Sequence, residues 1–487
     1  MNKLKRGEHY LTINQLASRY EKLSSQLSEQ YYNQDAGLSY DRELMKKLSQ
    51  ELTSISREFL EKFTEPRSMF LASIDTIATA ERLEVELDFH DQRMEKISTD
   101  KYSLNGKRVN WGNWRQFNSQ TDDSHKRKEV FDEFIAKAPR IAHLVKKRMS
   151  ISREVYERYK LTPLEAYLEH EQTTYEALIG MLEKLGDGAR KVFLTAADHY
   201  APEILHKPKT EYYDDFYTWR GRIYKPLDKY LKDKNPLAKI TETLKKMGFE
   251  PSTIKVDAED RPSKSPSASC WGIHVPNDVR ILYRKVSPFE DFGSVYHEFG
   301  HGIHDKSADP KDSVWKRYIV PMSVAETFSI LIQSVTEDSL FLKEELKLEN
   351  KAVQEIISRV HFMNLAFLTF YAANSIMKTE FWKKKYTIEQ AAKRWQQLTK
   401  RFFIETPGDY WLLHHVMPNY DLYSPSYVIA SVRVEAIKQK LAKEYGEAWW
   451  RNPEAGQYVR ELAQTRGEFN IKQWKLNPAA YLKAQET

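Results

Sequence analysis

The segment His297-Glu298-Phe299-Gly300-His301 constrains this chain more than any other stretch, because it reads H-E-x-x-H. Residues four apart lie on the same face of an α-helix, so the imidazoles of His297 and His301 can reach one metal ion. Glu298 lies beside them, where a carboxylate takes a proton from a water that the metal activates. The motif therefore predicts a helix that carries a metal site and its general base.

The residues around the motif predict where this helix begins and which face is buried. Ser287 is a preferred N-cap residue, Pro288 suits the first helical position, and Glu290 stands three residues after the serine. Gly300 and Gly302 lower the helix propensity, so we expect them where backbone or substrate approaches closely. The apolar residues at helical spacing, which indicate one buried face, are Phe289, Phe292, Tyr296, Phe299 and Ile303.

A third metal ligand is expected downstream, because a catalytic zinc normally has three protein ligands and one open position. Glu326 heads a strongly apolar helical run that would hold it rigidly. The alternative is that Ser323 and Glu326 form a capping box for their own helix. We favour the ligand interpretation and predict one zinc ion held by His297, His301 and Glu326. The other carboxylates of this region are Asp305, Asp309, Asp312, Glu337 and Asp338.

His304 follows His301 by three residues and continues the predicted metal helix. We interpret it as a residue behind the ligands or on the surface.

The remainder of the chain predicts a mainly α-helical protein. Among 487 residues there are only 17 glycines and 19 prolines, and long stretches are rich in Leu, Lys, Glu and Ala. We expect a helical N-terminal subdomain over residues 1–195 and a catalytic subdomain over residues 196–487. The expected helical segments are residues 11–27, 40–63, 70–87, 122–160, 163–185, 188–200 and 350–403, with a turn at Asn105-Gly106.

Alternating β-forming residues just before the metal helix predict a small sheet. Residues 270–275 and 279–283 flank a turn at residues 276–278, and residues 254–256 form a further short strand. An edge strand there would hold a peptide in extended form by main-chain hydrogen bonds. The alternative is a purely structural sheet.

Charge and composition exclude several classes of function. The net charge of +6 comes from interspersed basic and acidic residues, so we expect no nucleic-acid partner. Cys270 is the single cysteine, which fits a reducing compartment, and no neighbouring residue would activate it as a nucleophile. No window of eighteen apolar residues predicts a membrane span, and the first residues lack the apolar core of a signal peptide. We therefore expect a cytoplasmic protein.

A second group of polar aromatic residues lies near the C-terminal end. Ser424 and Pro425 predict a helix start, which leaves His415, Tyr420 and Tyr423 in a loop and Tyr427 in the first helical turn. Histidine and tyrosine donate hydrogen bonds well to the oxyanion that develops at a scissile carbonyl. Ordinary aromatic packing is the alternative.

Together these motifs resemble the thimet oligopeptidase and oligoendopeptidase F family of zinc metallopeptidases. The resemblance rests on residues 297–304, on Glu326, on the spacing of His415, Tyr420 and Tyr427, and on residues 449–456. It covers roughly residues 270–470. One departure is Ser424, where thimet-type members carry a tyrosine, so the oxyanion role is open among Tyr420, Tyr423 and Tyr427.

The resemblance implies a fold, a reaction and site residues. The implied fold is an elongated helical shell around a deep channel that admits short unfolded peptides and excludes folded proteins. The implied site has His297, His301 and Glu326 as zinc ligands and Glu298 as general base. The implied substrate-binding or transition-state groups are His415, Tyr420 and Tyr427.

Two alternatives to an internal-bond oligopeptidase stay open. A carboxypeptidase or dipeptidyl carboxypeptidase on the same helical zinc fold would grip the free C-terminus of a peptide with a Lys, Arg or Tyr. A helical binding protein with a vestigial H-E-x-x-H is the alternative outside enzymes.

Overall fold

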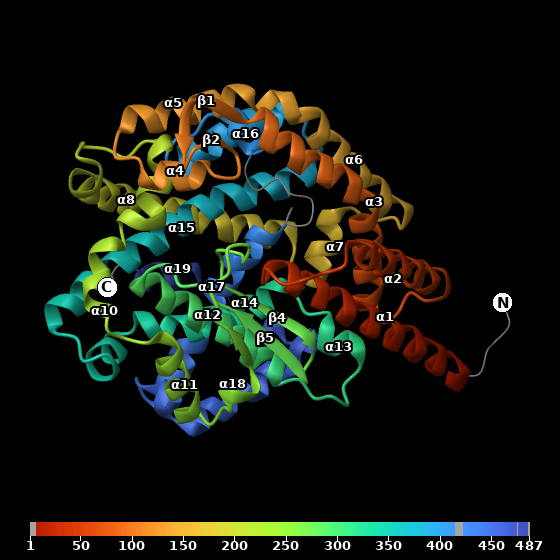
Figure 1. Cartoon of the computed structure of the whole chain (residues 1–487). Coiled ribbons are helices and arrows are strands. Elements are labelled where there is room, and N and C mark those ends of the chain that lie inside the picture. The colour runs from red at the N-terminus through yellow and green to blue at the C-terminus, as the bar shows by residue number, and fades with distance from the viewer. Residues whose placement is uncertain (1–5, 414–421, 475, 486–487) are drawn as a thin grey trace. The chain divides into compact units, whose positions relative to one another are not determined.

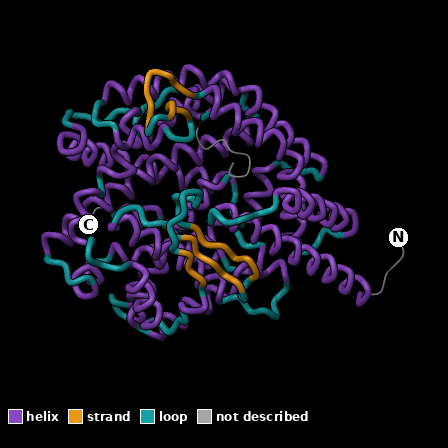
Figure 2. Tube along the Cα trace, in the orientation of Figure 1, coloured by secondary structure: helices purple, strands orange, loops and turns teal. Residues whose placement is uncertain are grey.

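The protein is mainly α-helical, as the sequence predicts (Figure 1). The computed structural model describes residues 6–413, 422–474 and 476–485. Within these residues 73% of the structure is helical, with 19 α-helices and two small sheets of two and three strands (Figure 2).

The chain divides into two compact units, each built from three separate segments. Unit 1 comprises Met1–Ala80, Lys229–Val353 and Ala430–Leu476, and unit 2 comprises Glu81–Asp228, Gln354–Ile429 and Asn477–Thr487. This division does not coincide with the expected boundary between residues 195 and 196. The physical reason is that three long helices, α3 (Arg67–Lys96), α15 (Asn350–Lys384) and α17 (Tyr423–Tyr445), begin in one unit and end in the other.

Unit 1 contains the helix with the H-E-x-x-H motif, which we call the predicted metal helix, and the three-stranded sheet. Its strands are β3 (Lys255–Asp257), β4 (Ser269–His274) and β5 (Asp278–Leu282). Its remaining helices are α1 (Arg6–Asp35), α2 (Arg42–Lys62), α10 (Asp228–Leu231), α11 (Pro236–Lys246), α12 (Pro288–Lys306), α13 (Val314–Tyr318), α14 (Met322–Gln333) and α18 (Pro453–Thr465).

The three-stranded sheet has the order β3-β5-β4, with β3 parallel and β4 antiparallel to β5. The small sheet predicted here is therefore confirmed, and its strands β4 and β5 form a hairpin. One face of β4 packs against α1, where the ring of Trp271 meets that of Tyr32 edge to face at 6.4 Å. The alternate residues face α12, since a Cβ added to Gly272 would lie 2.6 Å from Asp305 Oδ2.

The predicted metal helix, α12, begins where the sequence predicts. Ser287 is its N-cap, and its side chain accepts a hydrogen bond from the backbone N–H of Glu290, while Pro288 occupies the first helical position. The carboxylates of Glu290 and Asp291 lie in the first turn, where they favour the positive end of the helix dipole. Of the five predicted apolar residues, Phe289 is half-buried and the other four are buried.

Unit 2 contains the two-stranded sheet and most of the longest helices. Its strands are β1 (Ser98–Leu104) and β2 (Lys107–Asn110), which pair antiparallel. Its remaining helices are α4 (Trp114–Gln120), α5 (Ser124–Lys137), α6 (Ala142–Arg158), α7 (Pro163–His170), α8 (Tyr175–Leu205), α9 (Asp215–Tyr217), α16 (Ile388–Phe402) and α19 (Pro478–Ala484).

Three local features of unit 2 differ from the sequence expectation. The turn at Asn105-Gly106 is present, but the strands on either side were not predicted, because charged residues interrupt their alternation. The single helix expected over residues 122–160 is interrupted by a 3₁₀ turn that contains Pro139. Conversely, α8 continues through Gly186, which lets the ring of Phe402 approach to 2.5 Å from where a Cβ would stand.

One described helix, α15, is long and apolar enough to cross a membrane by length and composition. In its most apolar 18-residue window, 56% is buried inside the protein, as in the core helix of a soluble protein.

Candidate metal centre

The candidate site forms where α12 packs against α14 at a glycine. A Cβ added to Gly300 would lie 2.5 Å from the carbonyl oxygen of Phe328 and 2.6 Å from Cα of Ser329. Real Cβ contacts of that length do not occur, so the two backbones approach as closely as they do because this residue has no side chain. The close approach expected at Gly300 is therefore confirmed and involves backbone. Gly302 instead makes room for the side chain of Ile254.

This packing brings His297, His301 and Glu326 together. Their potential ligand atoms all lie within 4.8 Å of one another. Glu326 Oε2 is 3.5 Å from Nε2 of His297 and 3.7 Å from Nε2 of His301. The two histidine side chains are each 21% exposed and that of Glu326 only 2%, so the cluster opens on its imidazole side.

Partners on α14 orient two of these three side chains. His297 Nδ1 lies 2.9 Å from Gln333 Oε1, an acceptor that favours the tautomer with its proton on Nδ1. In that tautomer Nε2, which faces Glu326, carries a lone pair instead of a proton. The hydroxyl of Ser329 donates to Glu326 Oε2 at 2.9 Å. Both contacts are of the kind that fixes the tautomer and rotamer of metal ligands.

The donor types, and the two Glu326–histidine separations, are compatible with a zinc ion. In a tetrahedral site with zinc–ligand bonds near 2.1 Å, two ligand atoms are about 3.4 Å apart. The Glu326–histidine distances of 3.5 and 3.7 Å lie close to that value. Two imidazoles and one carboxylate are also a ligand set of catalytic zinc sites, which keep a position open.

The alternative role of Glu326 as a helix cap does not match the structure. Helix α14 begins at Met322 with Pro321 as N-cap, and no side chain caps it. The buried guanidinium of Arg433 instead donates to the carbonyl and hydroxyl of Ser323 and to the hydroxyl of Thr327, at 2.9–3.2 Å. Arg433 thereby fixes the turn of α14 that carries Glu326.

Glu298 interacts with the cluster, through His297 and Glu326, and with the backbone of Cys270 on the strand β4. Its pKa is raised to about 6, chiefly by burial and also by the Glu326 carboxylate, whereas His297 and a backbone hydrogen bond from Cys270 oppose the rise. A carboxylate with a raised pKa accepts a proton more readily than an ordinary glutamate. The pKa of the Cys270 thiol is raised well above its ordinary value by burial, which keeps the thiol protonated.

His304 is not among the clustered ligands, and it is buried rather than on the surface. Its ring stacks on Phe328 at 4.5 Å with an interplanar angle of 11°. Burial lowers the pKa of His304 well below its ordinary value, and the charge of Arg466 lowers it further. His304 therefore acts as a packing residue behind the metal helix. Asp305 pairs with Arg466 at 3.0 Å and is also outside the cluster.

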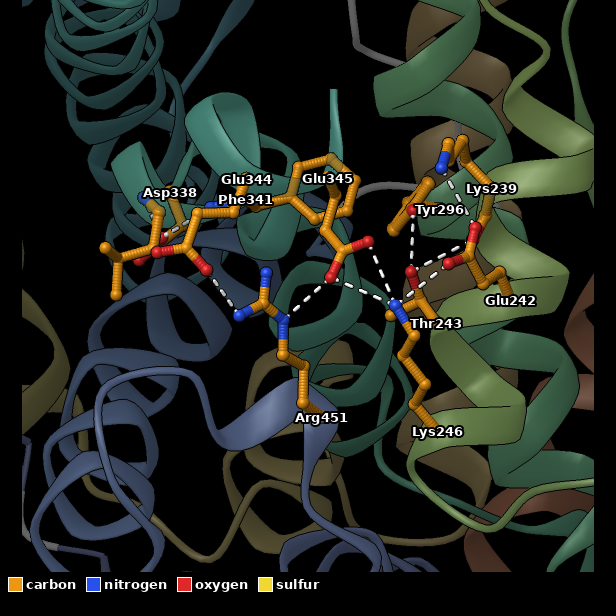
Figure 3. Close-up of polar contacts among 11 residues, drawn as sticks. Lys239, Glu242, Thr243, Lys246, Tyr296, Asp338, Phe341, Glu344, Glu345 and Arg451 are labelled. Carbon is orange, nitrogen blue, oxygen red and sulfur yellow. Dashed lines mark hydrogen bonds and ion pairs between the residues drawn. The ribbon is translucent and has the colours of Figure 1, made fainter. Parts of the chain in front are cut away.

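Next to His297, the side chain of Tyr296 anchors α12 in a polar network (Figure 3). Its hydroxyl is 3.0 Å from Thr243 Oγ1 on α11, and its ring meets Phe341 edge to face at 5.7 Å. Around this contact, Glu345 accepts from Lys246 at 3.0 Å and from Arg451 at 2.7 Å, as Figure 3 shows. The network ties three segments of unit 1 to the metal helix.

The predicted oxyanion donors are described only in part. His415 and Tyr420 lie outside the described residues. Helix α17 begins at Tyr423, two residues earlier than predicted, so Tyr423 is helical and Tyr427 lies in the second turn. Within unit 2 the half-buried ring of Tyr427 lies 4.8 Å from that of Tyr423 and 5.9 Å from that of Tyr371.

Ser424, where the sequence departs from the thimet-type pattern, is buried in unit 2. Its hydroxyl donates to Asn374 Oδ1 at 2.9 Å.

Sequence reasoning did not single out Ser329 and Gln333. Both stand on the face of α14 that carries Glu326, three and seven residues after it, so helical spacing from the proposed ligand would have found them.

Comparison with known proteins does not assign the chain to a family. No protein-family model matches the sequence, and no curated protein matches it.

We expect Gln333→Ala to weaken zinc binding by about 10- to 100-fold, the usual effect of removing an outer partner of a ligand histidine. The reason is that His297 loses the acceptor that fixes its Nδ1 proton. Competition with a chromophoric chelator measures the affinity. Gln439→Ala, an exposed glutamine bonded to Glu435, is the matched control and should leave it unchanged. An affinity equal to wild type in both variants would exclude this role for Gln333.

Proposed function

We propose that this protein is a zinc-dependent oligopeptidase that hydrolyses internal bonds of short, unfolded peptides, of the thimet oligopeptidase and oligoendopeptidase F type. The observation that carries the proposal is the convergence of His297, His301 and Glu326, with Glu298 adjacent. The elongated shell and channel that the resemblance implies remain predictions, as does a cytoplasmic location.

The three clustered side chains would hold the zinc ion, which supplies Lewis acidity that polarises a peptide carbonyl and acidifies a water. Glu298 takes the proton of the attacking water and passes it to the leaving amine.

The edge strand β4 supplies a means of holding substrate beside this base. It is the outer strand of its sheet, and among the described residues no strand pairs with its free side. Its backbone at Cys270 already reaches the Glu298 carboxylate. An extended peptide added along β4 would lie next to Glu298, and main-chain hydrogen bonds favour short peptides of varied sequence.

The oxyanion donors in this proposal come from the resemblance. His415 and Tyr427 would donate to the oxygen that becomes negative as the peptide carbonyl is attacked, with Tyr420 or Tyr423 assisting.

The proposal is tested with an internally quenched peptide, incubated with the purified full chain with and without a chelator. We expect cleavage between internal residues, its loss with the chelator and its return when zinc is added. Absence of cleavage with zinc present would favour a helical binding protein.

A second pair of substrates separates the two peptidase modes. A peptide with a free C-terminus and the same peptide amidated should be cut equally by an oligopeptidase that acts on internal bonds. Loss of cleavage on amidation would instead indicate a carboxypeptidase or dipeptidyl carboxypeptidase.

A further inference from the structure

Arg93, in the part of α3 that belongs to unit 2, is a half-buried residue whose guanidinium is held in one orientation. It lies over the ring of Phe89 at 4.9 Å and over the ring of Trp111 at 5.3 Å. Its Nη1 donates to the carbonyl oxygen of Leu413 at 3.2 Å. A guanidinium fixed in this way loses little side-chain entropy when it binds an anion.

Glu86 is the carboxylate whose charge acts on Arg93, but it pairs with two other arginines. Glu86 lies 2.8 Å from Arg148 and 3.7 Å from Arg82, both of which are buried. Arg148 also lies over the ring of Phe89, at 4.1 Å. Among the described residues no carboxylate forms an ion pair with Arg93, and its Nε–H is buried without an acceptor.

Like charges therefore crowd around Arg93. Burial, with the charges of Arg148 and Arg115, lowers the pKa of Arg93 to about 10, and Glu86 opposes this only in part. The guanidinium remains charged at neutral pH, so its neighbourhood has an excess of positive charge that an anion would relieve.

We propose that unit 2 binds a carboxylate at Arg93, through the N–H groups of the guanidinium that Leu413 leaves unused. Its planar fork matches a carboxylate, and the two aromatic rings keep the fork in place. If the proposed function holds, the carboxylate is that of a peptide, either the C-terminal one or that of an acidic side chain. The site itself does not depend on peptide hydrolysis.

Calorimetric titration of the full chain tests the site without any turnover. The probes are N-acetyl-leucine, N-acetyl-leucinamide, which lacks only the carboxylate, and inorganic phosphate. We expect binding of the acid and none of the amide. Arg93→Gln should weaken binding of the acid roughly 10- to 100-fold, the effect of losing charge-assisted hydrogen bonds.

Arg401→Gln is the matched control, since it removes the same charge from unit 2 at a guanidinium already paired with Asp187 at 2.6 and 3.0 Å. It should leave binding unchanged. Arg93→Lys keeps the charge without the planar fork, so it should bind the acid several-fold more weakly than wild type. If Arg93→Gln does not fold, the affinity of Arg93→Lys for the acid is the test of the proposal.

Three results would overturn the proposal: equal binding of acid and amide, equal weakening by the Arg93 and Arg401 variants, or phosphate binding as tightly as the acid. Titration of N-acetyl-glutamic acid α-amide then separates a side-chain carboxylate from a C-terminal one. Failure of peptide hydrolysis with binding intact would remove the peptidase proposal and leave this site.

Discussion

Glu298→Gln is expected to keep its zinc and to lose turnover of an internally quenched peptide by at least about a hundredfold, the usual lower contribution of a general base. Glutamine has the size of glutamate and keeps the hydrogen-bonding environment beside Cys270. It accepts no proton at neutral pH, so the attacking water would keep both of its protons. Steady-state hydrolysis and zinc content, measured on the same preparation, check the two halves of this prediction.

Glu290→Gln is the matched control, because it makes the same chemical change in the first turn of the same helix, away from the cluster. It should retain wild-type turnover. Retained turnover in Glu298→Gln would remove the general-base assignment, and loss of zinc from it would show that the change disturbs the site instead.

Gly300→Ala is expected to lower the free energy of unfolding by about 1–3 kcal/mol, the typical cost of overpacking a core. Alanine favours a helix by roughly 1 kcal/mol over glycine, so the propensity change alone has the opposite sign. The steric clash outweighs the gain in helix propensity, because the added Cβ meets backbone atoms that cannot rotate away. These atoms are the carbonyl oxygen of Phe328 and Cα of Ser329. As α12 and α14 separate, Glu326 moves from the histidines, and zinc affinity should fall as well.

Gly293→Ala, in the same helix, is the control for this variant. The nearest atom to its added Cβ is Gln333 Nε2 at 3.8 Å, an ordinary contact. We expect it to be as stable as wild type or more stable, by up to about 1 kcal/mol. Urea denaturation of both variants is the measurement, and a Gly300→Ala protein as stable as Gly293→Ala would contradict the close-packing account.

Local rules predicted much of the region around the site. The cap at Ser287, the proline after it and the hairpin over β4 and β5 depend on residues close in sequence, and they appear where expected. The strands on either side of Asn105-Gly106 were not predicted, because Lys101, Lys107 and Arg108 interrupt the alternation of apolar and polar residues that marks a strand. Two subdomains were expected, but the points where the chain passes from one unit to the other were not, because helices such as α3 and α17 carry no sequence signal there.

Within the site, the sequence predicted the features that depend on residue spacing along one helix. It did not predict the contacts that depend on how two helices pack together. The four-residue spacing of His297 and His301 follows from helix geometry, and Glu326 was chosen among several carboxylates by its rigid helical context. The burial of His304 against Phe328 depends on how α14 meets α12, which sequence periodicity does not give. The contact of Gln333 with His297 depends on the same packing.

Zinc binding at His297, His301 and Glu326 is tested by the zinc content of the purified full chain after extensive desalting, compared with that of His297→Ala. We expect one zinc per chain in the wild-type protein and less than about a tenth of that in the variant, since a site with three protein ligands loses one of them. A wild-type protein that binds no metal even when zinc is supplied would contradict this expectation. So would a His297→Ala variant that still holds one zinc per chain.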